Sequence, residues 1–135
     1  MKTLNEFTSR LKELLIKGRN YIRGNNETKI CAKPFVDKWS KKEILGHLID
    51  SGIKNLQRFT EIQFQNKPYT IYKYNQDALV KANNYQSIDA SRLLDLWLAI
   101  NYQILAVINL QTQLTLSYKI NFENDDSSDL HLMII

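Results

Sequence analysis

The chain has 135 residues and a mass of 15.8 kDa, so we expect one domain that spans residues 1–135. Hydrophobic residues make up 44% and charged residues 24%, which excludes disordered and fibrous classes, and a lone Cys31 excludes an internal disulfide and a Cys-rich zinc site. The net charge of +4 is the sum of +8 in residues 1–85 and −4 in residues 86–135. The lysines are scattered in the basic part, so we interpret them as a solvated surface rather than a nucleic-acid or membrane surface.

The N-terminal segment predicts an amphipathic helix. It has no apolar signal core and no run of 18 apolar residues follows, so we expect a cytoplasmic protein without a membrane span. Thr3 and Glu6 have the spacing of a capping box, and apolar residues then recur at helical spacing. The first helix should run from about residue 4 to 21, with Gly18 or Gly24 near its end and a loop over 25–34.

A second capping box predicts the start of the next helix. Ser40 and Glu43 form the box, and Trp39 precedes them at the position of a hydrophobic staple. The helix should span residues 41–65. The apolar stripe of this helix consists of Ile44, Leu48, Leu56, Phe59 and Ile62. His47 lies at the margin of that stripe.

The next part of the chain combines a polar connection and a third long helix. Pro68 ends the preceding region, and an aromatic-rich connection follows with a short helix around 76–82. Ser87 or Asp89 is placed to cap a helix over 90–110. That helix has a broad apolar face, so we expect it to be largely buried.

The C-terminal part predicts an extended segment and the start of a fourth helix. The alternation over 112–122 reads as a strand or extended segment, and 124–129 as a turn. An apolar helix begins at Leu130, and a helix of one or two turns has no cooperative reason to form alone. We therefore expect a four-helix bundle whose last helix is truncated or only beginning, and a homodimer whose second subunit covers the bare apolar faces.

Several segments resemble one known family when they are read in order. Residues 39–51 read Trp-Ser-Lys-Lys-Glu-Ile-Leu-Gly-His-Leu-Ile-Asp-Ser, and Asn55, Arg58-Phe59, residues 74–78 and Tyr85 follow. This order resembles the signature of the DinB-like superfamily, which includes YfiT-type proteins. The resemblance implies an all-α four-helix bundle with a long crossover between the second and third helices.

The resemblance also implies a divalent metal, nickel or zinc, held by three histidines. The first of these ligands corresponds to His47. The other two come from a His-x-x-x-His pair on the last helix, which this sequence does not contain, and His131 lies ahead of that position and receives no ligand role. A catalytic site of this kind needs three protein ligands. We therefore expect this chain to be metal-free unless another chain supplies ligands.

Three further residues have both a functional and a structural interpretation. Asp50 is placed to orient His47 or to pair with Lys54 one turn away. Arg58 is suited to an anionic substrate group or to an ion pair. Asp77 matches the family pattern, and it is equally suited to cap the short helix.

The remaining candidates are aromatic residues and the thiol. Trp97, Tyr102 and Tyr85 are interpreted as plain core or as the lining of a cleft. Cys31 lies in a predicted loop with no neighbouring histidine or acid in the sequence, which argues against a nucleophile.

Three functions are therefore open. The first is a metal-dependent hydrolase or thiol-dependent S-transferase of the DinB-like type, which we expect to be metal-free and inactive as this truncated chain. The second is a non-catalytic small-molecule-binding or interaction protein on the same bundle. The third, a nucleic-acid binder, rests on the sequence pI of 9.1 and ranks last because aromatic and basic residues form no evident stacking platform.

Overall fold

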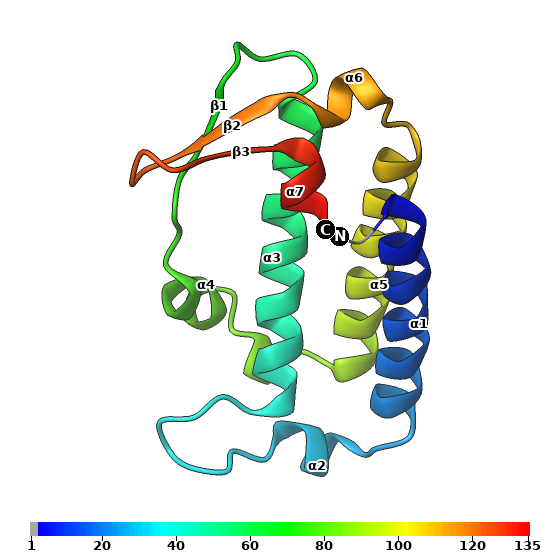
Figure 1. Ribbon diagram of the computed structural model, residues 1–135. Helices are drawn as coiled ribbons and strands as arrows, with labels where there is room; N and C mark the ends of the chain where they lie inside the picture. The colour runs from blue at the N-terminus through cyan, green and yellow to red at the C-terminus, as the bar shows by residue number, and fades with distance from the viewer. Residues whose placement is uncertain (1–2) are drawn as a thin grey trace.

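The computed structural model describes residues 3–135, and within them three long helices form the body of the molecule. Figure 1 shows these helices side by side, and α5 packs against both of the others. The expected all-α bundle is confirmed, with a small sheet at one end. The long helices are α1 (Leu4–Arg23), α3 (Lys41–Glu61) and α5 (Ala90–Asn109).

Shorter elements occupy the connections between the long helices. The short helix expected around residues 76–82 is present with those bounds, and an unexpected one lies within the expected loop at 25–34. They are α2 (Glu27–Cys31), β1 (Tyr69–Ile71), α4 (Gln76–Ala82), the 3₁₀ helix η1 (Tyr85–Ser87), α6 (Gln113–Leu116), β2 (Lys119–Phe122), β3 (Ser127–Asp129) and α7 (Leu130–Ile134).

Both expected capping boxes are formed. The Thr3 hydroxyl accepts from the Glu6 amide at 3.1 Å, and the Glu6 carboxylate accepts from the Thr3 amide at 3.1 Å. Ser40 and Glu43 make the same pair of bonds at the start of α3. These bonds satisfy amide groups that the first helical turn leaves free, which fixes where α1 and α3 begin.

Helix α3 ends earlier and faces the core differently than its sequence pattern predicts. It ends at Glu61 because a turn follows, in which the amide of Gln63 donates to the carbonyl of Thr60 at 3.1 Å. Leu45 and Ile49 are buried, whereas Ile44 and Leu48, which we expected in the core stripe, are 44% and 43% exposed. The expected stripe was therefore placed one residue off at the N-terminal half of α3, because α5 contacts the neighbouring face.

Helix α5 is the central helix of the body. It is long and apolar enough, by length and composition alone, to cross a membrane. In the structure it packs between α1 and α3, and Leu94, Leu105 and Ile108 are buried there. A core helix of a globular bundle has the same properties, and this position explains the broad apolar face.

A three-stranded sheet closes the end of the body near the C-terminal end of α3. Its order is β1-β2-β3, with β1 parallel to β2 and β3 antiparallel to β2. The expected extended segment at 112–122 is only partly correct, because α6 occupies its first half and β2 its second half. The segment 124–129, which we expected to be a turn, contains β3 in its last three residues. Ile120 of β2 is fully buried against Ile71 and Leu130.

Candidate functional site

His47 lies on the outer side of α3, away from α5. Its half-buried imidazole packs on the indole of Trp39, with ring centroids 5.1 Å apart and planes at 35°. Nδ1 is buried and has no hydrogen-bond partner within residues 3–135. The ring thus packs on an aromatic side chain and carries one buried nitrogen that is unsatisfied within the described residues.

Asp50 contacts a different set of residues than we expected. Its Oδ1 accepts from the Tyr85 hydroxyl at 2.6 Å and from the Asn83 amide at 3.2 Å. Across the described chain it forms no ion pair with Lys54, and it does not satisfy His47 Nδ1. The contacts therefore assign Asp50 to the connection between α4 and η1 rather than to the imidazole.

The buried Asp50 carboxylate and Tyr85 form a tight pair against α3. Burial and the hydrogen bond to Asp50 raise the pKa of Tyr85, so the phenol stays protonated and donates. The ring lies directly on the backbone at Gly46, where a Cβ would come within 2.1 Å of it. Glycine at position 46 thus permits the close approach that places η1.

A second polar group lies farther along the outer side of α3. The hydroxyls of Ser51 and Tyr74 are 2.8 Å apart. The Lys54 ammonium and the Arg58 guanidinium lie 5.6 Å and 5.8 Å from the centroid of the Tyr74 ring. Arg58 also donates to the carbonyl of Tyr72 at 3.0 Å. Sequence analysis identified Arg58 as a candidate, but no feature of the sequence indicated that the Tyr74 ring would lie beside it.

Asp77 lies in the first turn of α4 and is exposed. The cap of α4 is Asn75, whose side chain accepts from the Ala78 amide at 3.0 Å, so the capping interpretation of Asp77 is wrong. Asp77 instead lines a pocket of about 370 Å³ together with Trp39 and Tyr85. Trp39 is thus shared between this pocket and His47.

An open apolar groove runs between α1 and α3, with α5 as its floor. Its volume is about 710 Å³. Trp97 lines it, as the cleft interpretation predicts, whereas the buried Tyr85 lines the pocket beside Asp77 and Tyr102 is 52% exposed. The other lining residues are Phe7, Leu11, Leu14, Lys17, Gly18, Tyr21, Leu48, Ser51, Gly52, Asn55, Phe59, Asn101, Ile104, Met133 and Ile134.

The described residues do not fit a metal ion on their own. Residues 3–135 contain no group of three or more His, Cys, Asp or Glu side chains arranged to hold one. Figure 1 places α7, which carries His131 in its first turn, beside the C-terminal half of α3, whereas His47 belongs to the N-terminal half. A single imidazole does not provide the three ligands that a catalytic zinc-type site requires.

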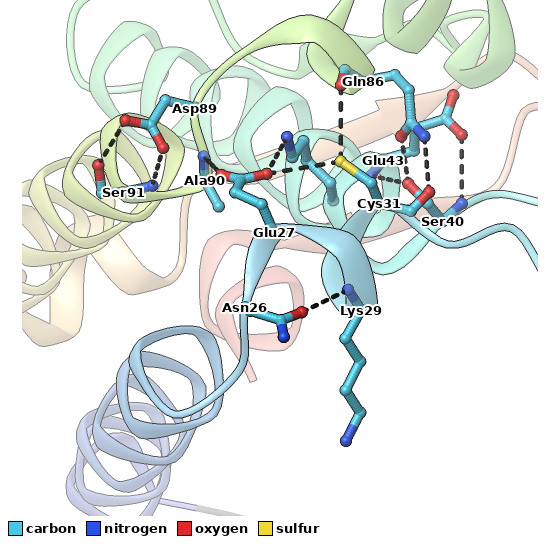
Figure 2. A network of polar contacts seen from close by, with 11 residues as sticks. Asn26, Glu27, Lys29, Cys31, Ser40, Glu43, Gln86, Asp89, Ala90 and Ser91 are labelled. Carbon is cyan, nitrogen blue, oxygen red and sulfur yellow. Dashed lines mark hydrogen bonds and ion pairs between the residues drawn. The ribbon is translucent and has the colours of Figure 1, made fainter.

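Cys31 belongs to a polar network at the base of the bundle rather than to a loop. Figure 2 shows its sulfur between Glu27 and Gln86, at 3.5 Å from Glu27 Oε2 and 4.0 Å from the Gln86 carbonyl. Because α2 forms, Glu27 lies one helical turn from Cys31, and our expectation that no acid neighbours the thiol is wrong.

The centre of that network is an ion pair between Glu27 and the buried Lys42. Lys42 Nζ lies 2.6 Å from Glu27 Oε2, and the Ala90 amide donates to Glu27 Oε1 at 2.7 Å. These two donors lower the pKa of Glu27 to about 2. Desolvation opposes the charge on Lys42, but its hydrogen bonds to Glu27 and Cys31 outweigh it and raise the pKa of Lys42. The network therefore joins α2 to the starts of α3 and α5.

Comparison with solved structures finds the same fold in other proteins. YfiT from Bacillus subtilis, described as "a probable metal-dependent hydrolase with an unusual four-helix bundle topology", superposes with a TM-score of 0.84 at 16% identity. The match covers 97% of this chain and 75% of YfiT. No family model matches the chain, and no curated protein sequence matches it with significance.

A mycothiol-dependent maleylpyruvate isomerase also matches, with a TM-score of 0.64 and 11% identity. The match covers 99% of this chain but only 57% of the isomerase, so this chain spans little more than half of that enzyme. A histidine-to-alanine mutant of the isomerase matches equally well in fold.

Together these likenesses define the class of the protein as a helical domain with the fold of YfiT, a four-helix bundle. The four-helix bundle fold that the resemblance of residues 39–51 implies is thereby confirmed. The identities of 16% and below establish the fold alone.

Proposed function

We propose that this domain is a cytoplasmic metal-dependent hydrolase or thiol-dependent S-transferase of the DinB-like type. His47 would provide one ligand to a divalent nickel or zinc ion, and the other ligands would come from a second copy of the chain. The observation that carries the proposal is the unsatisfied, buried Nδ1 of His47 on a helix that borders an open groove, in the fold shared with YfiT. Zinc-type catalytic sites provide a Lewis acid and a bound water of lowered pKa.

We propose a homodimer because the groove leaves apolar surface open. Leu14 and Leu48 are 42% and 43% exposed on its two walls. Apolar area in water costs about 25 cal/mol per Å². A standard interface buries about 800 Å² per partner, which is close to a tenth of the 8560 Å² surface of this chain. The groove and its walls are suited to form the centre of such an interface.

Elemental analysis of the full chain, purified without chelator, tests the metal proposal directly. We expect a stoichiometric divalent metal in the wild type and its loss in His47→Ala. His131→Ala is the matched control, because it removes the other histidine and should keep the metal. A wild-type dimer that carries no metal would contradict the proposal.

The second candidate is a non-catalytic small-molecule-binding protein. It is favoured by the absence of a three-ligand cluster within residues 3–135 and by the size of the groove. Ligand pockets commonly have volumes of about 300–1,000 Å³ and apolar walls. Saturable binding of an apolar fluorophore to metal-free protein, reduced by Leu48→Asp, would support this candidate.

Nucleic-acid binding is the third and weakest proposal. A salt titration of DNA binding tests it, since the log–log slope reports the number of phosphate contacts. A slope near zero would dismiss it.

A further inference from the structure

The polar row on the outer side of α3 has the properties of an anion-binding site. Ser51, Lys54 and Arg58 are spaced three and four residues apart, so they share one face of the helix, and Tyr74 lies against them. We propose that this row binds the carboxylate of an organic acid with an apolar body. The proposal rests on the proposed function only in so far as that acid is the substrate.

The two cations of the row lack acidic partners. Neither Lys54 nor Arg58 forms an ion pair within the part of the chain that the structure describes. Both lie near the Tyr74 ring instead, and like charges four residues apart on a helix repel each other. A bound anion would relieve that repulsion and complete the site.

The acids that share a pocket with Arg58 form hydrogen bonds elsewhere. Glu123 and Asp126 line a pocket of about 510 Å³ that includes Arg58. The Glu123 carboxylate accepts from the Lys73 amide at 3.1 Å, and the Asp126 carboxylate accepts from the Asn124 side chain at 2.8 Å. Neither carboxylate forms an ion pair with the guanidinium.

Arg58 is held in a fixed orientation. One terminal nitrogen donates to the Tyr72 carbonyl at 3.0 Å, and the other donates to Asn55 Oδ1 at 3.4 Å. A guanidinium has five N–H donors in a planar fork, so three of them stay free. A planar fork with free donors matches the two oxygens of a carboxylate.

The hydroxyl pair supplies one further donor. Ser51 and Tyr74 share one hydrogen bond of 2.8 Å, which uses one of their two hydroxyl hydrogens. The second hydrogen is free to donate to an anion beside the pair. The row thus combines two positive charges with neutral donors.

The groove next to this row indicates the rest of the ligand. Ser51 and Asn55 also line the apolar groove, where Leu48 and Phe59 are their neighbours on α3. A carboxylate bound between Arg58 and Ser51 would therefore lie at the edge of this groove, where its organic body can pack against the apolar wall that Leu48 and Phe59 form. A fatty acid or an aromatic acid fits this combination better than a sugar phosphate.

Calorimetric titration of the metal-free full chain with octanoate tests the proposal. We expect saturable binding of octanoate and at least tenfold weaker binding of octan-1-ol, which keeps the apolar body and lacks the charge. Arg58→Gln should weaken octanoate about tenfold, as expected for loss of a charge-assisted hydrogen bond. Tyr74→Phe, which retains the ring and removes the spare hydroxyl, should weaken it less.

Arg92→Gln is the matched control, because it removes the same charge from an exposed position at the start of α5. Equal affinities for octanoate and octan-1-ol, or equal losses in the Arg58 and Arg92 variants, would overturn the proposal. Thermal unfolding by circular dichroism verifies that each variant is folded. Because the assay contains no metal, a negative elemental analysis of the wild type and a negative titration are separate results.

Discussion

The two sides of α3 differ in burial although Ile49 and Leu48, adjacent in the sequence, are similarly apolar. On the side that faces α5, Ile49 is fully buried, and Gly52 brings the two helices close together. On the side that faces the groove, the adjacent Leu48 is 43% exposed, and Ser51 and Asn55 follow it. The comparison teaches that hydrophobic spacing identifies a helix that needs partners, but not which side already has one.

Truncation of a side chain on the α5-facing side of α3 should have the largest effect on stability. We expect Ile49→Ala to lower the free energy of unfolding by about 2–5 kcal/mol, because it opens a cavity in a packed core. Leu48→Ala, one residue away, should cost about 0.5 kcal/mol or less in the monomer. Urea denaturation measures both, and equal losses would show that the groove side is also buried.

The hydrogen bond between Tyr85 and Asp50 should have the next largest effect. Tyr85→Phe leaves the buried Asp50 carboxylate with only the Asn83 amide, and we expect a loss of about 1–3 kcal/mol. Tyr102→Phe is the matched control, because that side chain is 52% exposed. If both variants unfold at the same urea concentration, the pair does not stabilise the fold.

The Glu27–Lys42 pair predicts a smaller, pH-dependent effect. The pKa of Glu27 is about 2 in the folded chain and about 4.3 in an unfolded chain. The pair therefore stabilises the fold fully above about pH 5, and this contribution falls as the pH drops toward 2. Because the Glu27 side chain is 49% exposed, screening limits the contribution to about 1 kcal/mol or less.

A pH series of denaturation midpoints checks that contribution. We expect the difference between the wild type and Glu27→Gln to shrink as the pH falls from 5 to 2. A difference that stays constant over this range would mean that the charge on Glu27 does not stabilise the fold.

A charge introduced on the groove-facing side of α3 should have the smallest effect on the stability of the monomer. We expect Leu48→Asp to change monomer stability by about 0.5 kcal/mol or less, because its side chain already contacts water. The same change should abolish the proposed dimer, since it buries an unpaired carboxylate at the interface. Light scattering reports the mass, and an unchanged dimer in this variant would exclude the groove as the interface.

The elements that the sequence predicts well depend on local interactions. The capping boxes at Thr3 and Ser40 need only residues three apart, and they mark where α1 and α3 begin. The strands β1 and β3 escape prediction because each has three residues and is defined by its pairing with β2. The short helix α2 was not predicted for a related reason, because its Glu27 pairs with Lys42 of α3, a contact outside its own segment.

The candidate site divides in the same way. His47 and Arg58 are visible in the order of residues along α3. The partners of Asp50 and Ser51 are not, because Tyr85 and Tyr74 come from later segments that the fold brings back to α3. Sequence order therefore names candidate residues on α3, but not the side chains that later segments bring against them.

The parallel pairing of β1 with β2 also bears on the order of folding. Tyr69 pairs with Ile120, and both α4 and α5 lie between them along the chain. Closing such a long loop costs entropy before the strands gain any contact, whereas helices form from neighbouring residues. We therefore expect α1, α3 and α5 to assemble first, and the sheet end of the molecule to be the last to form and the first to exchange its amide hydrogens.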